Sequence, residues 1–322
     1  MKSLIDASAI HSAAHRIRKD IIRTATSESP NLSSIIKRPV YLKLENTQIG
    51  GSFKARGVLN KFAEIKSELP SQRFAAVSGG NFGIAIAQAA ANLNAHVTII
   101  MPKTAPASSI AKIRALRIPV IVTEDVREAF LQSELLAQQG YTILDDCDDT
   151  VIAEGHGTLA QEFIEDCPAL TDVFVAIGGG TMLAGVATAL KAIKPEIRIW
   201  GVETDGAASM DRALRAKTPV EIEVSSIIST LGVPIVSDRM LRHAQAYLED
   251  VLIVSDREAI AGMISFGENA GQWVELASGA ALAGAIHVAK KLPSDAVVGL
   301  VVCGGNIAAQ DMRNWIAYSS QD

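Results

Sequence analysis

The sequence has little cysteine, few aromatic residues and no long apolar run. Its only cysteines, Cys147, Cys167 and Cys303, are odd in number and far apart, which fits neither a disulfide framework nor a zinc knuckle. No stretch reaches the ~18 apolar residues that a membrane span needs. The segment 1–20 lacks the apolar core of a secretory signal. We therefore expect a cytoplasmic protein with no membrane partner, in which two of the cysteines are inert packing residues.

The chain also lacks an excess of positive charge. It has 30 basic and 35 acidic residues, mixed along the sequence, and a formal net charge of -5. No polybasic stripe exists to follow a phosphodiester backbone, so nucleic acid is excluded as a partner. Apolar residues make up 48% of the chain but aromatic residues only 5%. With abundant alanine, this composition is typical of helices packed closely on a parallel sheet.

Short apolar runs alternate with alanine-rich segments along most of the chain. We predict strands at 40–44, 74–77, 97–101, 120–123, 141–144, 172–177, 198–202, 251–254 and 298–302. Helices are predicted over 56–69, 83–92, 110–116, 125–139, 182–193 and 256–266, with Pro70 ending the first of them. This alternation indicates an α/β fold with open, mainly parallel sheets.

The length of 322 residues favours two domains. The acidic residues between 145 and 149 mark the best candidate boundary, and residues 71–147 form a compact alternating unit by themselves. Residues 1–70 have no obvious sheet of their own, so we expect them to pack on the second alternating unit. The predicted division is a small domain, 71–147, and a large discontinuous domain, 1–70 plus 148–322.

Four short motifs combine one lysine with glycine-rich turns. Three of the turns follow an apolar run that is predicted to be a buried strand. Ligands of open α/β sheets bind beyond the carboxyl ends of the strands, so these turns can surround one ligand. The motifs are Gly51-Ser52-Phe53-Lys54, Ser78-Gly79-Gly80-Asn81, Gly178-Gly179-Gly180-Thr181 and Cys303-Gly304-Gly305-Asn306.

The turn from Gly178 to Thr181 suits a phosphate group. Successive glycines allow backbone N–H groups to converge, and the helix predicted from Met182 adds its dipole. The dinucleotide pattern fails because position 183 is leucine, and the P-loop pattern fails because Val186 follows Gly185. A tight structural turn is the alternative interpretation.

A lysine together with a phosphate-binding turn points to pyridoxal 5'-phosphate, whose aldehyde forms an imine with an amine. Lys54 is the predicted imine former and the base that removes the proton from Cα of the substrate. Asn81 is a candidate donor to the ring phenolate oxygen. Ser78 and the amides of Gly79 and Gly80 are candidates for binding a substrate carboxylate. For Asn81 the alternative is a helix N-cap.

These motifs, in this order, resemble those of fold-type II pyridoxal-phosphate enzymes, in particular the branch of serine/threonine dehydratases and serine racemases. The resemblance extends over nearly the whole chain. It implies two open, mainly parallel-sheet domains, with Phe53 on the cofactor ring and Cys303 facing the pyridine nitrogen. It also implies that Gly178, Gly179, Gly180 and Thr181 hold the phosphate.

Departures from the family pattern narrow the reaction. Serine racemases that resemble this chain carry a serine, the base on the second face of Cα, where Gly79 stands here. This difference favours elimination over racemisation. Phe82, Thr181 and His156 also replace the usual residues and change the pocket.

A divalent cation site is expected to be weak. Related enzymes use a glutamate, a backbone carbonyl and an aspartate, which correspond to Glu203, Ala207 and Ser209. Serine in place of the aspartate removes one of the carboxylates that hard cations prefer, so we do not expect bound Mg²⁺.

The resulting prediction is a pyridoxal-phosphate-dependent ammonia-lyase. Its substrate would be L-threonine, L-serine or a related 3-hydroxy amino acid, and its products a 2-oxo acid and ammonia. The alternatives are a racemase, a β-replacement enzyme such as a cysteine synthase, and a non-catalytic pyridoxal-phosphate-binding protein. The resemblance further implies a homodimer.

Overall fold

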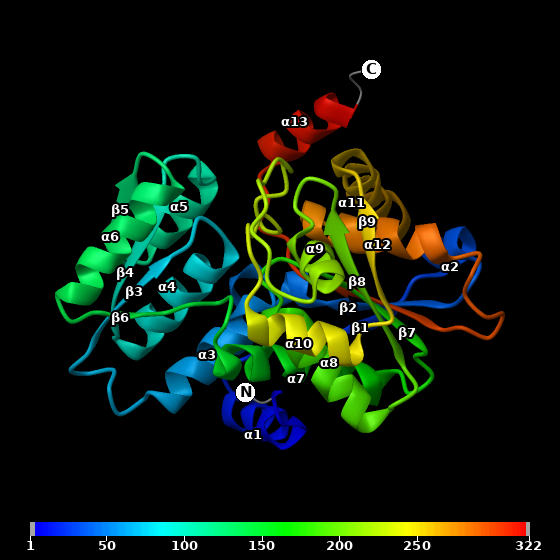
Figure 1. Ribbon diagram of the computed structural model, residues 1–322, viewed down its shortest axis with the longest axis horizontal. Coiled ribbons are helices and arrows are strands. Elements are labelled where there is room, and N and C mark those ends of the chain that lie inside the picture. The colour runs from blue at the N-terminus through cyan, green and yellow to red at the C-terminus, as the bar shows by residue number, and fades with distance from the viewer. Residues whose placement is uncertain (1–3, 320–322) are drawn as a thin grey trace.

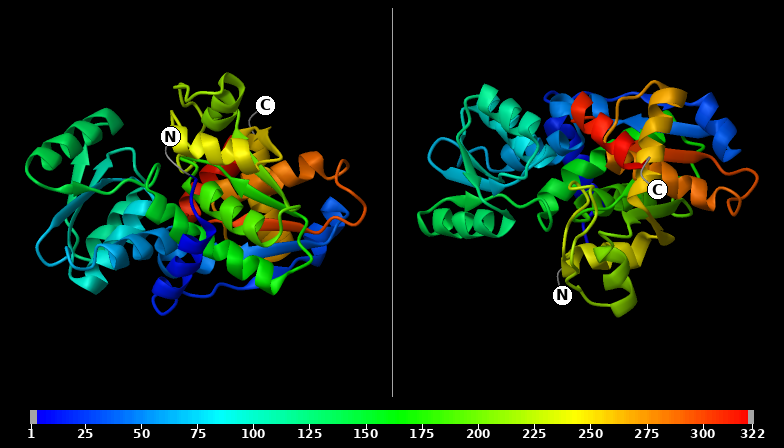
Figure 2. Two further views of the ribbon diagram at one scale, coloured as in Figure 1. Left: turned by 60° about the horizontal axis from the view of Figure 1, so that its bottom comes forward. Right: turned by 90° about the horizontal axis from the view of Figure 1, so that it is seen from above.

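The structure, a computed structural model, describes residues 4–319. These residues form two separate sheets, each flanked by helices, as Figures 1 and 2 show. Both sheets are mainly parallel, which confirms the predicted α/β class. None of the helices in the described range is long and apolar enough to span a membrane.

The larger sheet has six strands in the order β1-β2-β10-β7-β8-β9. All neighbouring pairs are parallel except β1 and β2. The strand β1 was missed because it is only three residues long, polar and partly exposed. The strands are β1 (Thr26–Glu28), β2 (Val40–Leu44), β7 (Asp172–Ala176), β8 (Arg198–Thr204), β9 (Asp250–Val254) and β10 (Val298–Val302).

The smaller sheet has four parallel strands in the order β5-β4-β3-β6. It stands at the left of Figure 1. Every one of its strands was predicted to within two residues at each end. They are β3 (Arg73–Val77), β4 (His96–Pro102), β5 (Val120–Thr123) and β6 (Thr142–Ile143).

Helices cover both faces of the six-stranded sheet, where the largest apolar core lies (Figure 1). Two of them, α11 and α12, pack on one face, and α7 and α8 pack on the other. The helices outside the smaller sheet are α1 (Ala7–Ile17), α2 (Pro30–Ile36), α3 (Lys54–Glu64), α7 (Thr150–Asp166), α8 (Thr181–Ile193), α9 (Ser209–Ala216), α10 (Asp238–Tyr247), α11 (Asp256–Ala270), α12 (Leu276–Val288) and α13 (Ala309–Ser319). The short 3₁₀ turns are η1 (Glu45–Thr47) and η2 (Ile49–Gly51).

The helices beside the smaller sheet are α4 (Asn81–Leu93), α5 (Ala107–Ala115) and α6 (Val126–Gln138). The helix predicted over 56–69 is wrong at both ends, because α3 begins at Lys54 and ends at Glu64. Tight turns follow it, and they fold the buried side chain of Leu69 back onto the protein. Pro70 restricts the backbone of the preceding residue, but the helix has already ended before this point.

The chain enters the smaller sheet after α3 and leaves it before α7. Strands on both sides of this excursion, β2 and β10, pair in parallel in the six-stranded sheet. The strands β1 and β2, from the first 70 residues, thus belong to the sheet of the second unit. The exact boundaries at 70 and 147 stay a prediction.

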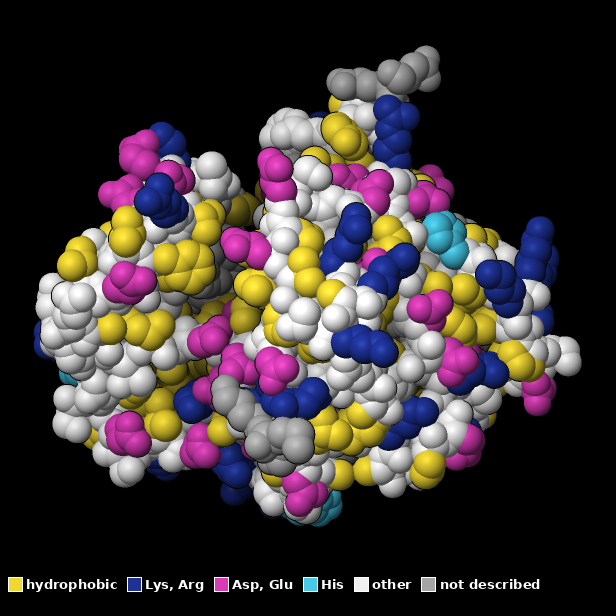
Figure 3. Space-filling view, viewed as in Figure 1, with side chains coloured by type: hydrophobic (Ala, Val, Ile, Leu, Met, Phe, Trp, Pro, Cys, Tyr) yellow, Lys and Arg dark blue, Asp and Glu magenta, His cyan; other side chains and the backbone are white. Residues whose placement is uncertain are grey.

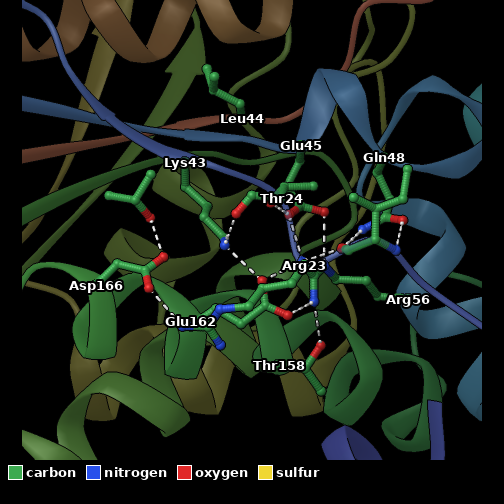
Figure 4. Close-up of polar contacts among 12 residues, drawn as sticks. Arg23, Thr24, Lys43, Leu44, Glu45, Gln48, Arg56, Thr158, Glu162 and Asp166 are labelled. Carbon is green, nitrogen blue, oxygen red and sulfur yellow. Dashed lines mark hydrogen bonds and ion pairs between the residues drawn. The ribbon is translucent and has the colours of Figure 1, made fainter. Parts of the chain in front are cut away.

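A buried cluster of charged residues joins β2, η1, α3 and α7 (Figure 4). The guanidinium of Arg56 donates to Glu45 and Glu162, each at 2.8 Å, and Lys43 Nζ donates to Glu162 at 2.6 Å. Burial acts to raise the pKa of the Glu162 carboxyl, but the hydrogen bonds from Arg56 and Lys43 outweigh it and lower the pKa. Because Arg56 lies two residues after Lys54, this cluster fixes the start of α3.

Removing one member of this cluster leaves the others buried and unpaired. We predict that Arg56→Ala lowers the free energy of unfolding by about 3–5 kcal/mol, measured by urea denaturation. The control is Arg215→Ala, which breaks an ion pair on α9 whose arginine side chain is 74% exposed; its expected cost is below about 1 kcal/mol. Equal, small losses in both variants would contradict the role assigned to Arg56.

Candidate active site

A cavity of about 310 Å³ lies between elements of the two sheets. Figure 3 shows the molecule hollowed between the two lobes of Figure 1. Turns that follow β3, β7 and β10 reach this cavity, because parallel strands present their carboxyl ends at one edge of a sheet. All the predicted cofactor and substrate residues line it: Phe53, Lys54, Ser78, Gly79, Gly80, Asn81, Gly178, Gly179, Gly180, Thr181 and Cys303.

Lys54 is the first residue of α3, and its amine reaches into the cavity. Nζ lies 4.9 Å from the centre of the Phe53 ring and 5.8 Å from that of Phe82. The Phe53 N–H donates to the carbonyl of Cys303 at 3.0 Å, and Ser52 forms a bridge with Gly304. The lysine turn is therefore attached to the end of β10.

Among the contacts described, Asp146 lies closest to the lysine amine, and none of the predicted site motifs contains it. Its Oδ2 lies 2.6 Å from Lys54 Nζ, and its carbonyl accepts from Thr181 Oγ1 at 2.8 Å. From the sequence, the acidic residues from 145 to 149 mark only a candidate domain boundary. Their position directly after the predicted strand 141–144 was the available signal.

Cys147, next to Asp146, also lines the cavity. Of the cysteines outside the predicted site, only Cys167, which is buried in the main core, is an ordinary packing residue. The expectation of two such residues was therefore wrong. The cause is the loop after β6, which turns Cys147 towards Gly179.

The glycine turn after β7 has a backbone that side chains would obstruct. Gly180 has φ +95°, a conformation that L side chains rarely adopt, and a Cβ on Gly179 would lie 2.7 Å from Cys147 Sγ. The helix α8 begins at Thr181, so its first N–H groups have no acceptor within the helix. A narrow, side-chain-free cradle with free N–H donors and a helix dipole fits a phosphate group.

Asn81 is the first residue of α4, and Gly80 occupies the N-cap position. The alternative interpretation of Asn81 as an N-cap is thus wrong. Its Nδ2 instead donates to the two carboxylate oxygens of Glu275, at 3.0 and 2.9 Å, and its Oδ1 accepts from Asn306 Nδ2 at 2.8 Å. Burial raises the pKa of Glu275. None of the predicted site residues is Glu275, although it lies in a stretch similar to the family.

Ser78 follows β3 and lines the cavity. Its Oγ accepts from the Gly83 N–H at 2.9 Å, so the hydroxyl caps the first turn of α4. The hydroxyl group can still donate its own hydrogen, and rotation about the C–O bond can direct this hydrogen to a ligand in the cavity.

Cys303 follows β10, and its side chain is almost fully buried. Its Sγ lies 3.3 Å from Ser278 Oγ, which also accepts from the Cys303 N–H at 3.1 Å. Burial raises the pKa of the Cys303 thiol to about 12. The thiol is therefore neutral at pH 7, in keeping with a residue that faces an unprotonated ring nitrogen.

His156 stands behind Phe53 rather than in the cavity. The two rings are 4.7 Å apart and meet edge to face. The imidazole is fully buried, neither ring nitrogen has a hydrogen-bond partner in the described structure, and burial lowers the pKa of His156 well below its usual value. A neutral imidazole supports the ring of Phe53 from behind.

The candidate cation ligands are engaged in contacts of their own. Both carboxylate oxygens of Glu203 accept backbone N–H groups, from Met210 and Asp211, each at 2.9 Å. Glu203 thus caps the start of α9 rather than facing the carbonyl of Ala207. The third candidate, Ser209, offers only a buried hydroxyl. One capped carboxylate and one hydroxyl fit a divalent cation poorly.

Comparison with known proteins agrees with this geometry. A family model described as pyridoxal-phosphate dependent enzyme matches residues 17–304. The chain is 32% identical to an L-threonine ammonia-lyase of Thermotoga maritima, over 91% of this chain and 74% of that protein. It is 30% identical to an L-threo-3-hydroxyaspartate ammonia-lyase of Saccharomyces cerevisiae, over 94% of this chain and 93% of that protein.

The fold is also that of solved structures. Maize serine racemase superposes with a TM-score of 0.90 at 25% identity, covering 99% of this chain and all of the other. A reactive lysine, a phosphate cradle and a neutral thiol in one cavity define a site for pyridoxal phosphate. The chain belongs to the family of pyridoxal-phosphate dependent enzymes.

A substitution that adds one methyl group to the glycine turn tests whether this turn binds the phosphate. We predict that Gly180→Ala weakens binding of pyridoxal phosphate at least about tenfold, because the added Cβ meets Met240 at 3.0 Å and strains the turn. Equilibrium dialysis with the cofactor measures this loss. Gly140→Ala is the control, since Gly140 has φ +85° and an added Cβ there has no neighbour within 4 Å. Unchanged affinity in Gly180→Ala would remove the turn from the site.

Glu203 should make stability depend on pH. Burial raises the pKa of Glu203 from 4.5 to about 7, so its contribution is complete below pH 4.5 and is lost as the pH rises towards 7. Glu203→Gln removes this titration. The stability of the variant relative to wild type is therefore expected to rise by up to about 3 kcal/mol between pH 4.5 and 7. Urea denaturation at each pH measures the difference, and a constant difference would refute the assignment.

Proposed function

We propose that this protein is an ammonia-lyase that converts L-threonine, L-serine or a related 3-hydroxy amino acid to a 2-oxo acid and ammonia. The observation that carries the proposal is the convergence of the Lys54 amine, the glycine turn 178–180 and the Cys303 thiol on one cavity. The relatives support an ammonia-lyase at the level of the family.

The residues present have distinct tasks towards the cofactor. Pyridoxal phosphate, when bound, supplies an aldehyde that condenses with an amine and a ring that withdraws electrons from Cα of the substrate. The N–H groups of the glycine turn and of the start of α8 would hold its phosphate. Phe53 would lie against its ring, and Cys303 would face its ring nitrogen. Asn81 would donate to its phenolate oxygen in place of one of its two hydrogen bonds to Glu275.

The substrate is bound from the side of the smaller sheet. Ser78 and the backbone amides of Gly79 and Gly80 receive the α-carboxylate, as the start of α4 favours an anion there. The Lys54 amine removes the proton from Cα and holds it at Nζ. The β-hydroxyl group would leave as water with a proton supplied from the region of the cofactor phosphate. Hydrolysis of the resulting enamine would give the 2-oxo acid and ammonia.

Two features favour elimination over racemisation. Gly79 has no side chain that could return a proton to the second face of Cα. The neutral Cys303 thiol cannot keep the ring nitrogen protonated, so negative charge at Cα is short-lived and rapid departure of the β-substituent is favoured. The structural similarity to serine racemase makes racemisation the second candidate. Chiral analysis of serine after incubation with the protein distinguishes elimination from racemisation. Formation of D-serine faster than pyruvate would make racemisation the main reaction.

The expected homodimer rests on the resemblance, and the expected cytoplasmic location rests on the composition of the sequence. A homodimer in the cytoplasm stays our prediction. Measurement of the molar mass in solution tests whether the protein is a homodimer.

Lys54→Ala tests the reaction most simply. We predict a loss of ammonia release of at least about a thousandfold, because both the imine former and the base are removed. Lys61→Ala on the same helix is the control, since that lysine pairs with Asp149 outside the cavity; it should keep its activity. Full ammonia release by Lys54→Ala would contradict the proposal.

A further inference from the structure

The ion pair between Lys54 and Asp146 places a carboxylate where the substrate must react. The two charged atoms are 2.6 Å apart, and both side chains are only slightly exposed, 17% and 23%. The carbonyl of Asp146 is anchored by Thr181 at the start of α8. The carboxylate is thus held beside the lysine amine by the same turn that forms the phosphate cradle.

The other charges of the cavity do not balance this carboxylate. Among the lining residues, all of which the structure describes, Lys54 is the only cation, whereas Asp146 and Glu275 are both acidic. Glu275 is nearly fully buried and accepts hydrogen bonds from Asn81 and Asn306. Acidic side chains also gather along the lower part of the hollow in Figure 3.

The rest of the wall offers no ionic partner for a charged side chain. Apolar residues from the smaller lobe, Pro102, Ala105 and Val126, face the cavity. Thr230 and Leu231 line it from the loop before α10. A methyl or hydroxyl group is accommodated by such a surface, but a second carboxylate would be left without an ionic partner and would face Asp146.

We propose that Asp146 sets the charge of the substrate side chain that the cavity accepts. This inference rests on the proposed ammonia-lyase function and narrows it. Neutral 3-hydroxy amino acids such as threonine and serine are accepted, because a β-hydroxyl group donates to a carboxylate. An acidic 3-hydroxy amino acid, 3-hydroxyaspartate, is excluded by repulsion between like charges.

Substrate comparison with the holoenzyme tests this. Release of ammonia and 2-oxo acid is measured with L-threonine, L-serine and L-threo-3-hydroxyaspartate at one pH and ionic strength. The kcat/KM for 3-hydroxyaspartate is expected to be at least about 100-fold below that for threonine, since like charges placed together are strongly unfavourable. In Asp146→Asn, the ratio of kcat/KM for threonine to kcat/KM for 3-hydroxyaspartate should fall at least about tenfold.

The matched control is Asp145→Asn. It removes the same charge from the adjacent residue, whose side chain does not line the cavity but accepts from the Cys147 N–H. The ratio of kcat/KM for the two substrates should change much less than in Asp146→Asn, because the Asp145 carboxylate is exposed to solvent and does not line the cavity. An equal change in both variants would show a general effect of net charge and would overturn the role of Asp146.

Binding gives a second measure that does not need turnover. Absorbance titration of the wild-type holoenzyme with serine, 3-hydroxyaspartate and L-2,3-diaminopropionate compares neutral, anionic and cationic side chains of similar size. The anionic compound, 3-hydroxyaspartate, should bind weakest to the wild-type protein. The substitution Asp146→Asn should strengthen binding of this compound and weaken binding of the cationic compound, diaminopropionate. Binding of 3-hydroxyaspartate as tight as that of serine would overturn the inference. Binding in the expected order without release of a 2-oxo acid from any compound would support the inference and overturn the proposed function instead.

Discussion

The position of the Lys54 amine depends on contacts made on both sides of its turn. On one side, the backbone of Phe53 and Ser52 is hydrogen-bonded to the end of β10. On the other side, Arg56 is fixed in the buried charge cluster with Glu45 and Glu162. Because β10 also pairs with β7, the amine is fixed relative to the glycine turn that follows β7. The distance between the amine and the phosphate cradle is therefore a property of the six-stranded sheet.

The two sheets divide the work of the site. Groups assigned to the cofactor, the lysine, the glycine turn and the thiol, lie at the edge of the six-stranded sheet. Groups assigned to the substrate carboxylate, Ser78, Gly79 and Gly80, lie at the edge of the smaller sheet, as does Asn81, the candidate donor to the phenolate oxygen of the cofactor. Asp146 lies on the connection that returns from the smaller sheet to α7. We therefore infer that the substrate is selected at the junction of the two lobes, mainly by the charge of its side chain.

The sequence predicted the strands, the class of fold and the cluster of glycine turns, because each of these has a local pattern. Buried parallel strands are short apolar runs, and their carboxyl ends share one edge. Two of the elements that it missed lack such a pattern. The strand β1 is polar and three residues long, and α12 is apolar on all sides, so its sequence has no helical periodicity. The partners Lys54 with Asp146 and Asn81 with Glu275 are far apart in sequence, and only the fold brings them together.

The covalent attachment of the cofactor is the most direct test of the central claim. Borohydride reduction of the holoenzyme fixes pyridoxal phosphate on its amine, and peptide mass spectrometry then locates the modified lysine. The account predicts the phosphopyridoxyl group on Lys54 in nearly all molecules. Modification of another lysine instead, or no stable modification of a protein that still releases ammonia, would contradict it.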